Sequence, residues 1–345
     1  MARVDLTVRG GGIFGLSIAW AAVRRGATVR VIETVAIGAG SSGGIVGALA
    51  PHVPDAWNAK KAFQLDSLLM AQDWWTAVAA ASGLQTGYGR MGRLQPIADD
   101  AALDLAQRRV QSAQDLWRGQ ARWQVVRATG GDWEPLSPTG HLIHDDLSAR
   151  INPRLALTAL VAAIRSRGGE VVVGEAPDEG QVIWATGLAG LGDLSQALGR
   201  RIDGGVKGQA ALLGCNAAGA GQVFVGGLHI VPHGDGTVAV GSTSEATWDA
   251  ADTTDDKAQD LIARARAALP VLTNAPVVGL WAGVRPRAAS RAPVLGAFPG
   301  RAGQFVANGG FKIGFGMAPK VAEVMVDLVL DGRDAIPDGF RASAL

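Results

Sequence analysis

Three glycines near the start of the chain, Gly10, Gly12 and Gly15, have the spacing G-x-G-x-x-G, and Glu33 follows them. This arrangement suits the binding of a dinucleotide, because each glycine meets a different steric demand. Gly10 permits a tight turn, Gly12 lets the backbone approach a pyrophosphate, and Gly15 lets a helix pack closely on a strand. The N–H groups at the start of that helix face the phosphates, and the Glu33 carboxylate accepts hydrogen bonds from a ribose.

The elements around these glycines lead to the same interpretation. Strands are expected over 4–9 and 28–33, with a helix between them whose apolar residues recur at i, i+3, i+4 and i+7. The first strand is more polar than a central parallel strand usually is, since it carries Asp5, Thr7 and Arg9. The unit as a whole predicts a dinucleotide-binding domain. The alternative is a glycine-rich turn that binds no ligand.

Composition limits the class of protein. The chain has 345 residues, 48% hydrophobic and 18% charged, with a net charge of +1. These values indicate a soluble globular protein with one large or two intertwined domains, and they give no support to nucleic-acid binding. The single cysteine, Cys215, excludes an internal disulfide and a cysteine-rich metal site, so no metal is predicted. No secretory signal and no run of roughly 18 apolar residues is found, which predicts a cytoplasmic protein without a membrane span.

Periodicity further along the chain predicts the remaining organisation. Helices are expected over 60–82, 99–117, 153–167 and 317–331. Two short strands are expected over 170–173 and 181–185. The segment 206–245 has the alternation of an antiparallel sheet, with a hairpin turn at 234–236. Parallel βα units at both ends and antiparallel strands between them predict a nucleotide-binding domain that is interrupted by a second domain.

Four segments together resemble the D-amino-acid oxidase family of flavoproteins, especially its glycine oxidase and sarcosine oxidase branches. They are the opening fingerprint through Glu33, the glycine-rich stretch 37–51, the strand end 182–187, and Trp-Ala-Gly-Val-Arg-Pro at 281–286 with 309–314 behind it. They occur in the family's order and span nearly the whole chain. The predicted fold is therefore α/β: a discontinuous Rossmann-like FAD-binding domain (1–85, 141–200 and 280–345) with an inserted α+β substrate-binding domain built on antiparallel sheet (86–140 and 201–279).

The resemblance implies FAD as the cofactor. The sequence favours it as well, because the chain has one strong phosphate-binding fingerprint and no second site for NAD(P)H. Cys215 does not match the cysteine that tethers flavin in monomeric sarcosine oxidases, so the FAD is expected to be non-covalent. The resemblance places these residues against the cofactor: Gly10, Gly12, Ile13, Phe14, Gly15, Glu33, Gly40, Ser41, Ser42, Gly47, Ala48, Leu49, Val173, Ala185, Thr186, Gly187, Gly310, Phe311, Lys312 and Ile313.

Two cations are candidates for binding a substrate carboxylate. Arg285 sits where the family has its carboxylate-binding arginine, and the planar fork of a guanidinium suits that task. Lys312 stands where glycine oxidases carry arginine. Each has an alternative: a surface salt bridge for Arg285, and assistance to oxygen reduction or an ordinary acid partner for Lys312. Arg287 and Arg291 either favour an acidic substrate or are simply exposed.

Histidines are the other candidates for the substrate pocket. His229 stands where the glycine oxidase branch has an active-site tyrosine, so it is expected to bind substrate or line the pocket; the alternative is a strand histidine with an ordinary partner. His52 follows the loop that faces the flavin and is a second pocket candidate, while His233 is expected to be solvated in its turn. Leu49 is expected to press on the flavin. The single tyrosine, Tyr88, excludes the paired-tyrosine lid of D-amino-acid oxidases.

The predicted function is an FAD-dependent oxidase or dehydrogenase of a small amino acid or N-methyl amino acid, such as glycine, sarcosine or a D-amino acid. Hydride transfer to flavin N5 would give an imine that hydrolyses, and dioxygen or a quinone would take the electrons. One alternative is a flavin enzyme that acts on an aminomethyl-uridine group of tRNA. The near-neutral charge and the lack of an appended domain count against this alternative. Another is an NAD-binding protein without flavin chemistry. The oligomeric state stays open.

Overall fold

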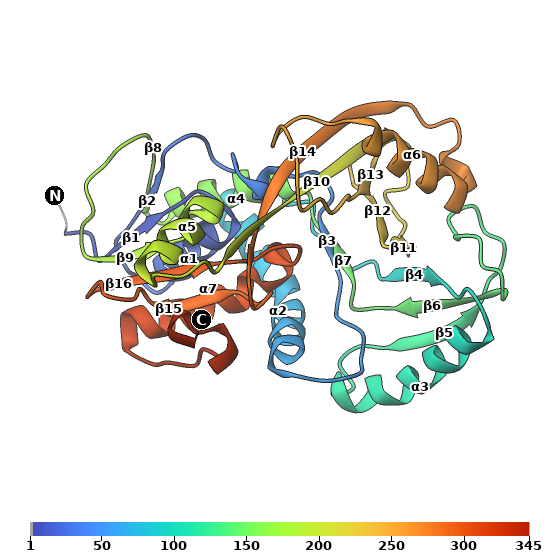
Figure 1. The fold of residues 1–345 in the computed structure, drawn as a ribbon, viewed down its shortest axis with the longest axis horizontal. Helices are drawn as coiled ribbons and strands as arrows, with labels where there is room; N and C mark the ends of the chain where they lie inside the picture. The colour runs from blue at the N-terminus through green and yellow to red at the C-terminus, as the bar shows by residue number, and fades with distance from the viewer. Residues whose placement is uncertain (1–2, 345) are drawn as a thin grey trace.

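A computed structural model describes residues 3–344 of the chain. Its strands form two large sheets, of six and eight strands, and one small two-stranded sheet. The six-stranded sheet lies on the left of Figure 1 and the eight-stranded sheet on the right, with helices packed around both. The predicted class is confirmed: a mainly parallel sheet of the nucleotide-binding type is combined with a separate, largely antiparallel one.

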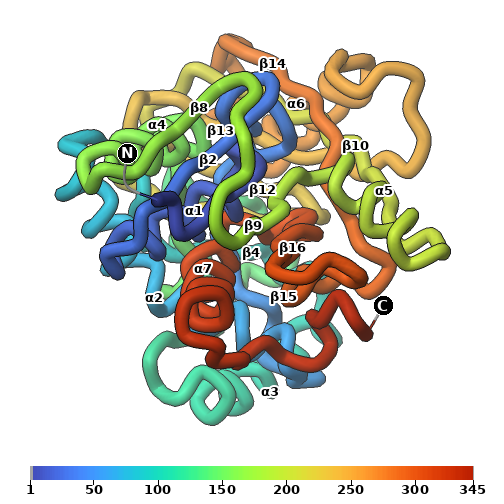
Figure 2. Tube along the Cα trace, turned by 90° about the vertical axis from the view of Figure 1, so that its left-hand side faces the viewer, coloured from blue at the N-terminus to red at the C-terminus, as the bar shows by residue number. Residues whose placement is uncertain are grey.

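The six-stranded sheet joins strands from the beginning, middle and end of the chain, which lie side by side in Figure 2. Its order is β15-β16-β9-β1-β2-β8; β15 is antiparallel to β16, and all other neighbours are parallel. The chain runs outward from β1 in one direction through β2 and β8, and in the other through β9 and β16. Ligands bind at such a reversal point, beyond the carboxyl ends of the strands. The strands are β1 (Leu6–Arg9), β2 (Val29–Glu33), β8 (Glu170–Val173), β9 (Gln181–Trp184), β15 (Val294–Ala297) and β16 (Gln304–Asn308).

All the helices predicted from periodicity are present, and two more were not predicted, α5 and α6. The helices of the described residues are α1 (Ile13–Arg24), α2 (Ala59–Ser82), α3 (Asp100–Leu116), α4 (Pro153–Ser166), α5 (Gly187–Ala197), α6 (Asp256–Ala268) and α7 (Gly314–Asp331). The start of α7 differs from the expected residue 317. A turn in which the Ile313 N–H donates to the Gly310 oxygen (2.9 Å) leads directly into the helix. Tertiary packing thus overrides the low helix propensity of Gly314 and Gly316.

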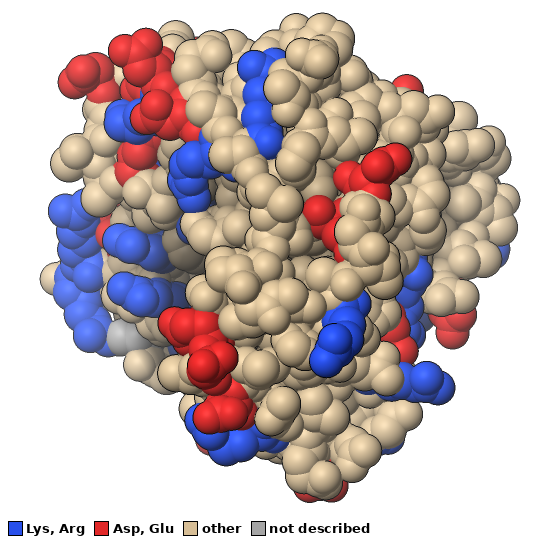
Figure 3. Space-filling model, turned by 90° about the vertical axis from the view of Figure 1, so that its right-hand side faces the viewer, with Lys and Arg blue, Asp and Glu red and all other residues tan. Residues whose placement is uncertain are grey.

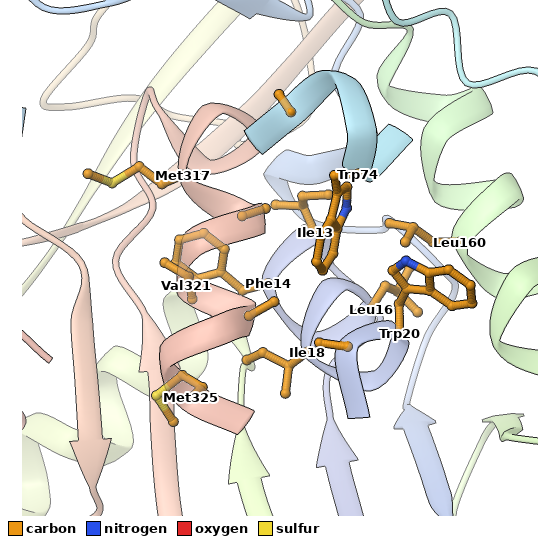
Figure 4. Packing of buried hydrophobic residues seen from close by; sticks show 14 of the residues in the cluster. Ile13, Phe14, Leu16, Ile18, Trp20, Trp74, Leu160, Met317, Val321 and Met325 are labelled. Carbon is orange, nitrogen blue, oxygen red and sulfur yellow. The ribbon is translucent and has the colours of Figure 1, made fainter. Parts of the chain in front are cut away.

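Helix α1 is buried on almost every side because three helices surround it. Ile18 faces Met325 of α7, and Trp20 lies beside Leu160 of α4, with α2 at the amino end of α1 (Figure 4). Each of these four side chains is at most 1% exposed. Burial of a side chain of this size stabilises the fold by about 1.5–3 kcal/mol. The packing therefore holds the amino end of α1 firmly against the parallel sheet.

The polar residues of the first strand have specific partners. The Thr7 side chain is fully buried, and its hydroxyl donates to the Glu179 oxygen (2.8 Å) while accepting from the Glu179 N–H (3.0 Å). Arg9 donates through Nε to Asp178 (2.7 Å) and lies over the Trp184 ring. A buried hydroxyl with both functions satisfied costs little. A central strand can therefore carry these residues.

The eight-stranded sheet has the order β14-β10-β13-β12-β11-β4-β6-β5. All neighbours in it are antiparallel except β4 and β11, which are parallel. The predicted hairpin turn at 234–236 joins β12 to β13. The strands are β4 (Arg93–Pro96), β5 (Trp123–Arg127), β6 (His141–Asp145), β10 (Asp203–Gly214), β11 (Gln222–Val225), β12 (Leu228–Pro232), β13 (Thr237–Gly241) and β14 (Val277–Ala288); β3 (Ala48–Leu49) and β7 (Ala149–Arg150) form the small sheet.

The division into domains remains a proposal, and strand pairing corrects two of its boundaries. Residues 141–145, assigned to the cofactor domain, form β6 and pair with β4 and β5 of the eight-stranded sheet. Residues 280–288 were assigned to the cofactor domain too, but β14 pairs with β10 along its length. Sequence periodicity identifies a strand without revealing its partner. Both segments therefore belong with the antiparallel sheet.

No helix among residues 3–344 is long and apolar enough to cross a bilayer. On the face shown in Figure 3, several basic side chains gather at the left edge with acidic ones near them, and broad uncharged areas cover much of the rest.

Candidate functional site

The turn between β1 and α1 requires glycine at two positions. Gly10 has φ +112°, and a Cβ there would lie 2.4 Å from the Ala185 oxygen. A Cβ on Gly15 would lie 2.0 Å from the Gly10 oxygen. Neither contact is possible, since side chains cannot approach backbone that closely. Gly15 therefore serves the packing of helix on strand and does not line the cavity described below.

The amino end of α1 points into an open space. Gly12 is its N-cap and provides no side-chain cap; a Cβ there would meet the Ser42 hydroxyl at 3.1 Å. The Ile13 N–H donates to that hydroxyl (3.0 Å). The Glu33 carboxylate is fixed at the end of β2, since it accepts from the N–H groups of Gly11 (2.7 Å) and Val35 (2.9 Å). These contacts set a helix N-terminus and a carboxylate beside one another.

A cavity of about 720 Å³, called the first cavity here, opens at this point. Its volume suits a large cofactor. The hydroxyl oxygen of Thr186 is buried there without a hydrogen-bond partner in the structure. An orphaned polar atom and a helix N-terminus beside a cavity fit a nucleotide cofactor. The first cavity is lined by these predicted residues: Gly10, Gly12, Ile13, Phe14, Glu33, Gly40, Ser41, Ser42, Ala185, Thr186, Gly187, Gly310 and Phe311.

A second cavity, of about 380 Å³, adjoins the first. The two share lining residues that include Ser42, Trp281 and Phe311. The second cavity brings together Arg285, Lys312 and His229, three of the four predicted catalytic residues. Gly47 and Ala48 line it as well. A group that fills the first cavity would therefore reach the edge of a cationic pocket.

Arg285 is 8% exposed and has no carboxylate partner in the described chain. Its Nη2 donates to the Ser242 hydroxyl (2.6 Å) and its Nη1 to the Thr243 oxygen (3.3 Å). The nearby acid, Glu245, accepts instead from Gln209 (3.1 Å) and Lys257 (2.8 Å). Burial lowers the pKa of Arg285 to about 10, so the guanidinium is still charged at neutral pH. Its remaining N–H groups are available to an anionic ligand.

Lys312 comes from the turn before α7 and brings a second positive charge. Its Nζ lies 5.8 Å from the centre of the Phe311 ring, and it forms no ion pair within residues 3–344. Burial, followed by repulsion from Arg285, lowers the pKa of Lys312. Two cations thus approach one pocket from different elements, β14 and the β16–α7 turn.

His229 is a neutral polar group beside these cations. Burial, reinforced by the charges of Arg93 and Lys312, lowers its pKa to about 3. Its Nδ1 is buried without a hydrogen-bond partner, and its ring lies 4.6 Å from that of Phe224. A buried imidazole nitrogen with no protein partner is costly. A ligand that hydrogen-bonds to it would remove that cost.

Several predicted site residues lie away from both cavities. His52 is half-buried and donates its backbone N–H to the Gln64 side chain (2.9 Å), so it is held by α2 and does not reach the pocket. Leu49 is 1% exposed within the hydrophobic core. Val173 is 55% exposed at the end of β8, and Ile313 packs against the core. The sequence places each of these residues in or near a motif, but only the packing of the chain decides whether its side chain faces a cavity.

The expectation for His233 is wrong. It is 2% exposed, and its Nε2 lies 3.0 Å from the Ile45 oxygen. Burial lowers its pKa. The turn at 234–236 folds back on the loop before β3, so a histidine beside a turn is enclosed by a distant segment.

The sequence did not reveal the residues that hold Arg285. Ser242 and Thr243 follow β13, which is distant along the chain. Gly208 lies in β10, and a Cβ on it would be 1.8 Å from the Arg285 Nη2. A glycine in the middle of a strand was the available signal, because it marks close approach of another group. Trp281 lies at the boundary of the two cavities, and its place in the motif at 281–286 does not indicate this position.

Three features indicate an enzyme that uses a nucleotide cofactor. They are the glycine turn at the reversal point of a parallel sheet, the cofactor-sized cavity and the adjoining cationic pocket. The family model for DAO, described as FAD dependent oxidoreductase, matches residues 5–328. The chain belongs to this family, and FAD is its cofactor. The resemblance found in the sequence is confirmed.

Curated relatives and solved structures agree with this assignment. Glycine oxidase of Pseudomonas putida is 28% identical over 97% of this chain and 96% of its own. Glycine oxidase of Pseudomonas aeruginosa is 34% identical, over 50% of this chain and about half (49%) of that protein's length. The crystal structure of glycine oxidase from Geobacillus kaustophilus has a TM-score of 0.83 at 22% identity, covering 98% of this chain and 97% of that chain. This last likeness concerns the fold.

Proposed function

We propose that this protein oxidises the C–N bond of a small amino acid or N-methyl amino acid, using FAD. One observation carries the proposal: the buried guanidinium of Arg285 has no carboxylate partner in the described chain and lies in a pocket that adjoins the cofactor-sized cavity. A buried charge without a partner is strongly unfavourable unless a ligand compensates it. The names of the glycine oxidase relatives support a small amino acid as that ligand.

The residues of both cavities fit FAD. The α1 N-terminus with Gly12 would hold the pyrophosphate, Glu33 the ribose, and Thr186 another polar group of the cofactor. When bound, FAD would accept a hydride from the carbon next to the substrate nitrogen, leaving an imine that water hydrolyses, and would pass the electrons to dioxygen or a quinone. The amino end of α7 would favour negative charge beside it.

The protein's own residues would bind and orient the substrate. Arg285 would take the carboxylate through its free N–H groups, while Ser242 and Thr243 prevent the guanidinium from turning away. His229, neutral near pH 7, would accept a hydrogen bond from the substrate amine. Orientation of this kind provides much of the rate enhancement without a strong acid or base. We place the reaction in the cytoplasm.

The proposal is tested by adding candidate substrates to the holoprotein in the absence of oxygen and measuring the flavin absorbance. Purified holoprotein is expected to show flavin absorbance that is bleached by glycine, sarcosine, a D-amino acid or L-proline. Arg285→Ala is expected to keep its flavin and to raise the KM for a carboxylate substrate by about 100-fold, the value of a charge-assisted hydrogen-bonded pair. Flavin that no amine bleaches would refute the proposal.

Arg287→Ala is the matched control. Arg287 lies two residues further along β14, outside the lining of both cavities, with its guanidinium over the Phe311 ring. The Arg287→Ala substitution is expected to change the KM by less than about threefold, because Arg287 is not expected to bind the substrate carboxylate. An equal rise of the KM in both variants would mean that the general positive charge of the region, and not Arg285 in particular, binds the substrate.

A further inference from the structure

The second cavity carries more positive charge than one carboxylate balances. Arg285 and Lys312 are its charged lining residues, and no aspartate or glutamate lines it among residues 3–344. Glu245, the acid that faces Arg285 from beyond the lining, is already bound by Lys257, Gln209 and Thr243. His229 adds no charge near neutral pH. An amino acid with a single carboxylate would leave one cation uncompensated.

The two cations are held independently of each other. Arg285 lies in the gap above Gly208 and is fixed by Ser242 and Thr243. Lys312 projects from the β16–α7 turn, where its Nζ lies 5.8 Å from the centre of the Phe311 ring. Because they stand on different elements, they can bind two different groups of one ligand. A flexible lysine also suits a group whose position is less strictly defined.

Aromatic side chains line the cavity that Lys312 borders. Phe224, Phe311, Phe315 and Trp281 line the same cavity. Lys312 itself is exposed, so its ammonium group is accessible to an anionic group of a ligand that fills this cavity. A charge-assisted hydrogen bond contributes about 1.5–3 kcal/mol, or roughly 10- to 100-fold in affinity. This is enough to discriminate between substrates.

We propose that Lys312 binds a second carboxylate, and that the preferred substrates are small amino acids or N-substituted glycines that carry two carboxylates. The inference rests on the proposed function, in which Arg285 takes the carboxylate common to all amino acids. The C–N bond that is oxidised, and the fate of the electrons, are unchanged. The second carboxylate determines which amine is chosen.

The experiment compares acids with their uncharged amides. Holoprotein is reduced anaerobically with iminodiacetate and with N-(carbamoylmethyl)glycine, and with the D and L forms of aspartate and asparagine. Each pair differs by a carboxylate against an amide of nearly equal size. In at least one pair the acid is expected to exceed the amide in its second-order rate constant for flavin reduction by at least about tenfold. Ratios near one in all the pairs that react would overturn the proposal.

Variants assign the effect to Lys312. Lys312→Met is expected to reduce the acid-to-amide ratio about tenfold or more, and Lys312→Arg to retain most of it. Lys320→Met is the control, since Lys320 pairs with Glu323 on α7 and lines neither cavity. A ratio that survives in Lys312→Met would overturn the proposal, even if both substrates react more slowly. If glycine bleaches the flavin but the acids reduce it no faster than their amides, this inference alone is refuted. If no amine bleaches the flavin, the proposed function itself is refuted.

Discussion

At the scale of single residues, the site depends on which acid pairs with which base. Glu245 is close enough to influence Arg285, but it is bound by Lys257 and Gln209, so the guanidinium keeps N–H groups to offer. His229 is kept neutral by burial and by nearby cations. Charge is therefore concentrated on two side chains. A pocket that carries only positive charges selects anions more strongly than a pocket that carries charges of both signs.

This arrangement predicts that carboxylate binding weakens at alkaline pH. Burial lowers the pKa of Arg285 to about 10, and that of Lys312 below its ordinary value of 10.5. Both side chains lose their charge as the pH rises through these values, so the attraction for an anion is present at neutral pH and lost above. The Kd of acetate, measured from the flavin spectrum, is expected to rise about tenfold or more between pH 7 and pH 10.5. A constant Kd over that range would exclude both cations as its ligands.

At the scale of elements, the pairing of β10 with β14 builds the carboxylate site. Val206 is the partner of Arg285 in the register, and Gly208 is the partner of Gly283. The side chain of Arg285 extends along the sheet into the space left by Gly208. A shift of one residue between these strands would turn the guanidinium to the other face.

Gly208→Ala is therefore expected to displace the guanidinium without unfolding the strand. The added Cβ would meet Arg285 Nη2 at 1.8 Å, and this atom is the movable end of a flexible side chain. The substrate KM is expected to rise about tenfold or more, as for a lost charge-assisted contact, with a smaller effect on kcat and on the thermal midpoint. Gly204→Ala in the same strand is the control, because its Cβ finds its nearest atom, Arg287 Nη2, at 3.5 Å. Equal KM values in the two variants would contradict the positioning role of Gly208.

At the scale of the whole molecule, the cofactor site is assembled from segments of the beginning, middle and end of the chain. The Gly10–Gly15 turn, the end of β9 and the turn before α7 all border the first cavity. The second cavity adds residues from β12 and β14. Neither sheet could provide the site alone. Binding of FAD is therefore expected to stabilise the contact between both parts.

Buried histidines predict that the fold is less stable in mild acid. Burial lowers the pKa of His52, His229 and His233 below the ordinary value of 6.5. Between pH 7 and pH 5 the unfolded chain takes up protons that the folded chain does not, so the stability present above pH 6.5 is lost as the pH falls. The slope is up to about 1.4 kcal/mol per pH unit for each histidine.

Urea unfolding of the holoprotein at pH 7, 6 and 5 would measure this slope. His229→Gln removes one titrating group and is expected to reduce the slope below pH 6.5. An unfolding midpoint that does not change with pH in the native protein would show that these histidines gain protons as readily in the folded state.

The sequence by itself determined the local elements and the family. Glycine spacing, Glu33 and apolar periodicity identified the βαβ unit with its helix α1, four of the other six helices and the α/β class, because these patterns depend on neighbours within a few residues. It also singled out Arg285, Lys312 and His229, which lie in one cavity. These residues were found because each belongs to a recognisable motif.

Only the tertiary structure decided which side each residue faces and what it contacts. Leu49 follows a recognisable motif but lies in the core, His52 is half-buried and held by Gln64, and His233 is enclosed by a loop from far along the chain. The role of Gly208 arises from Arg285, on a strand that lies far along the chain. Pairings of this kind depend on long-range packing, which local sequence patterns do not specify.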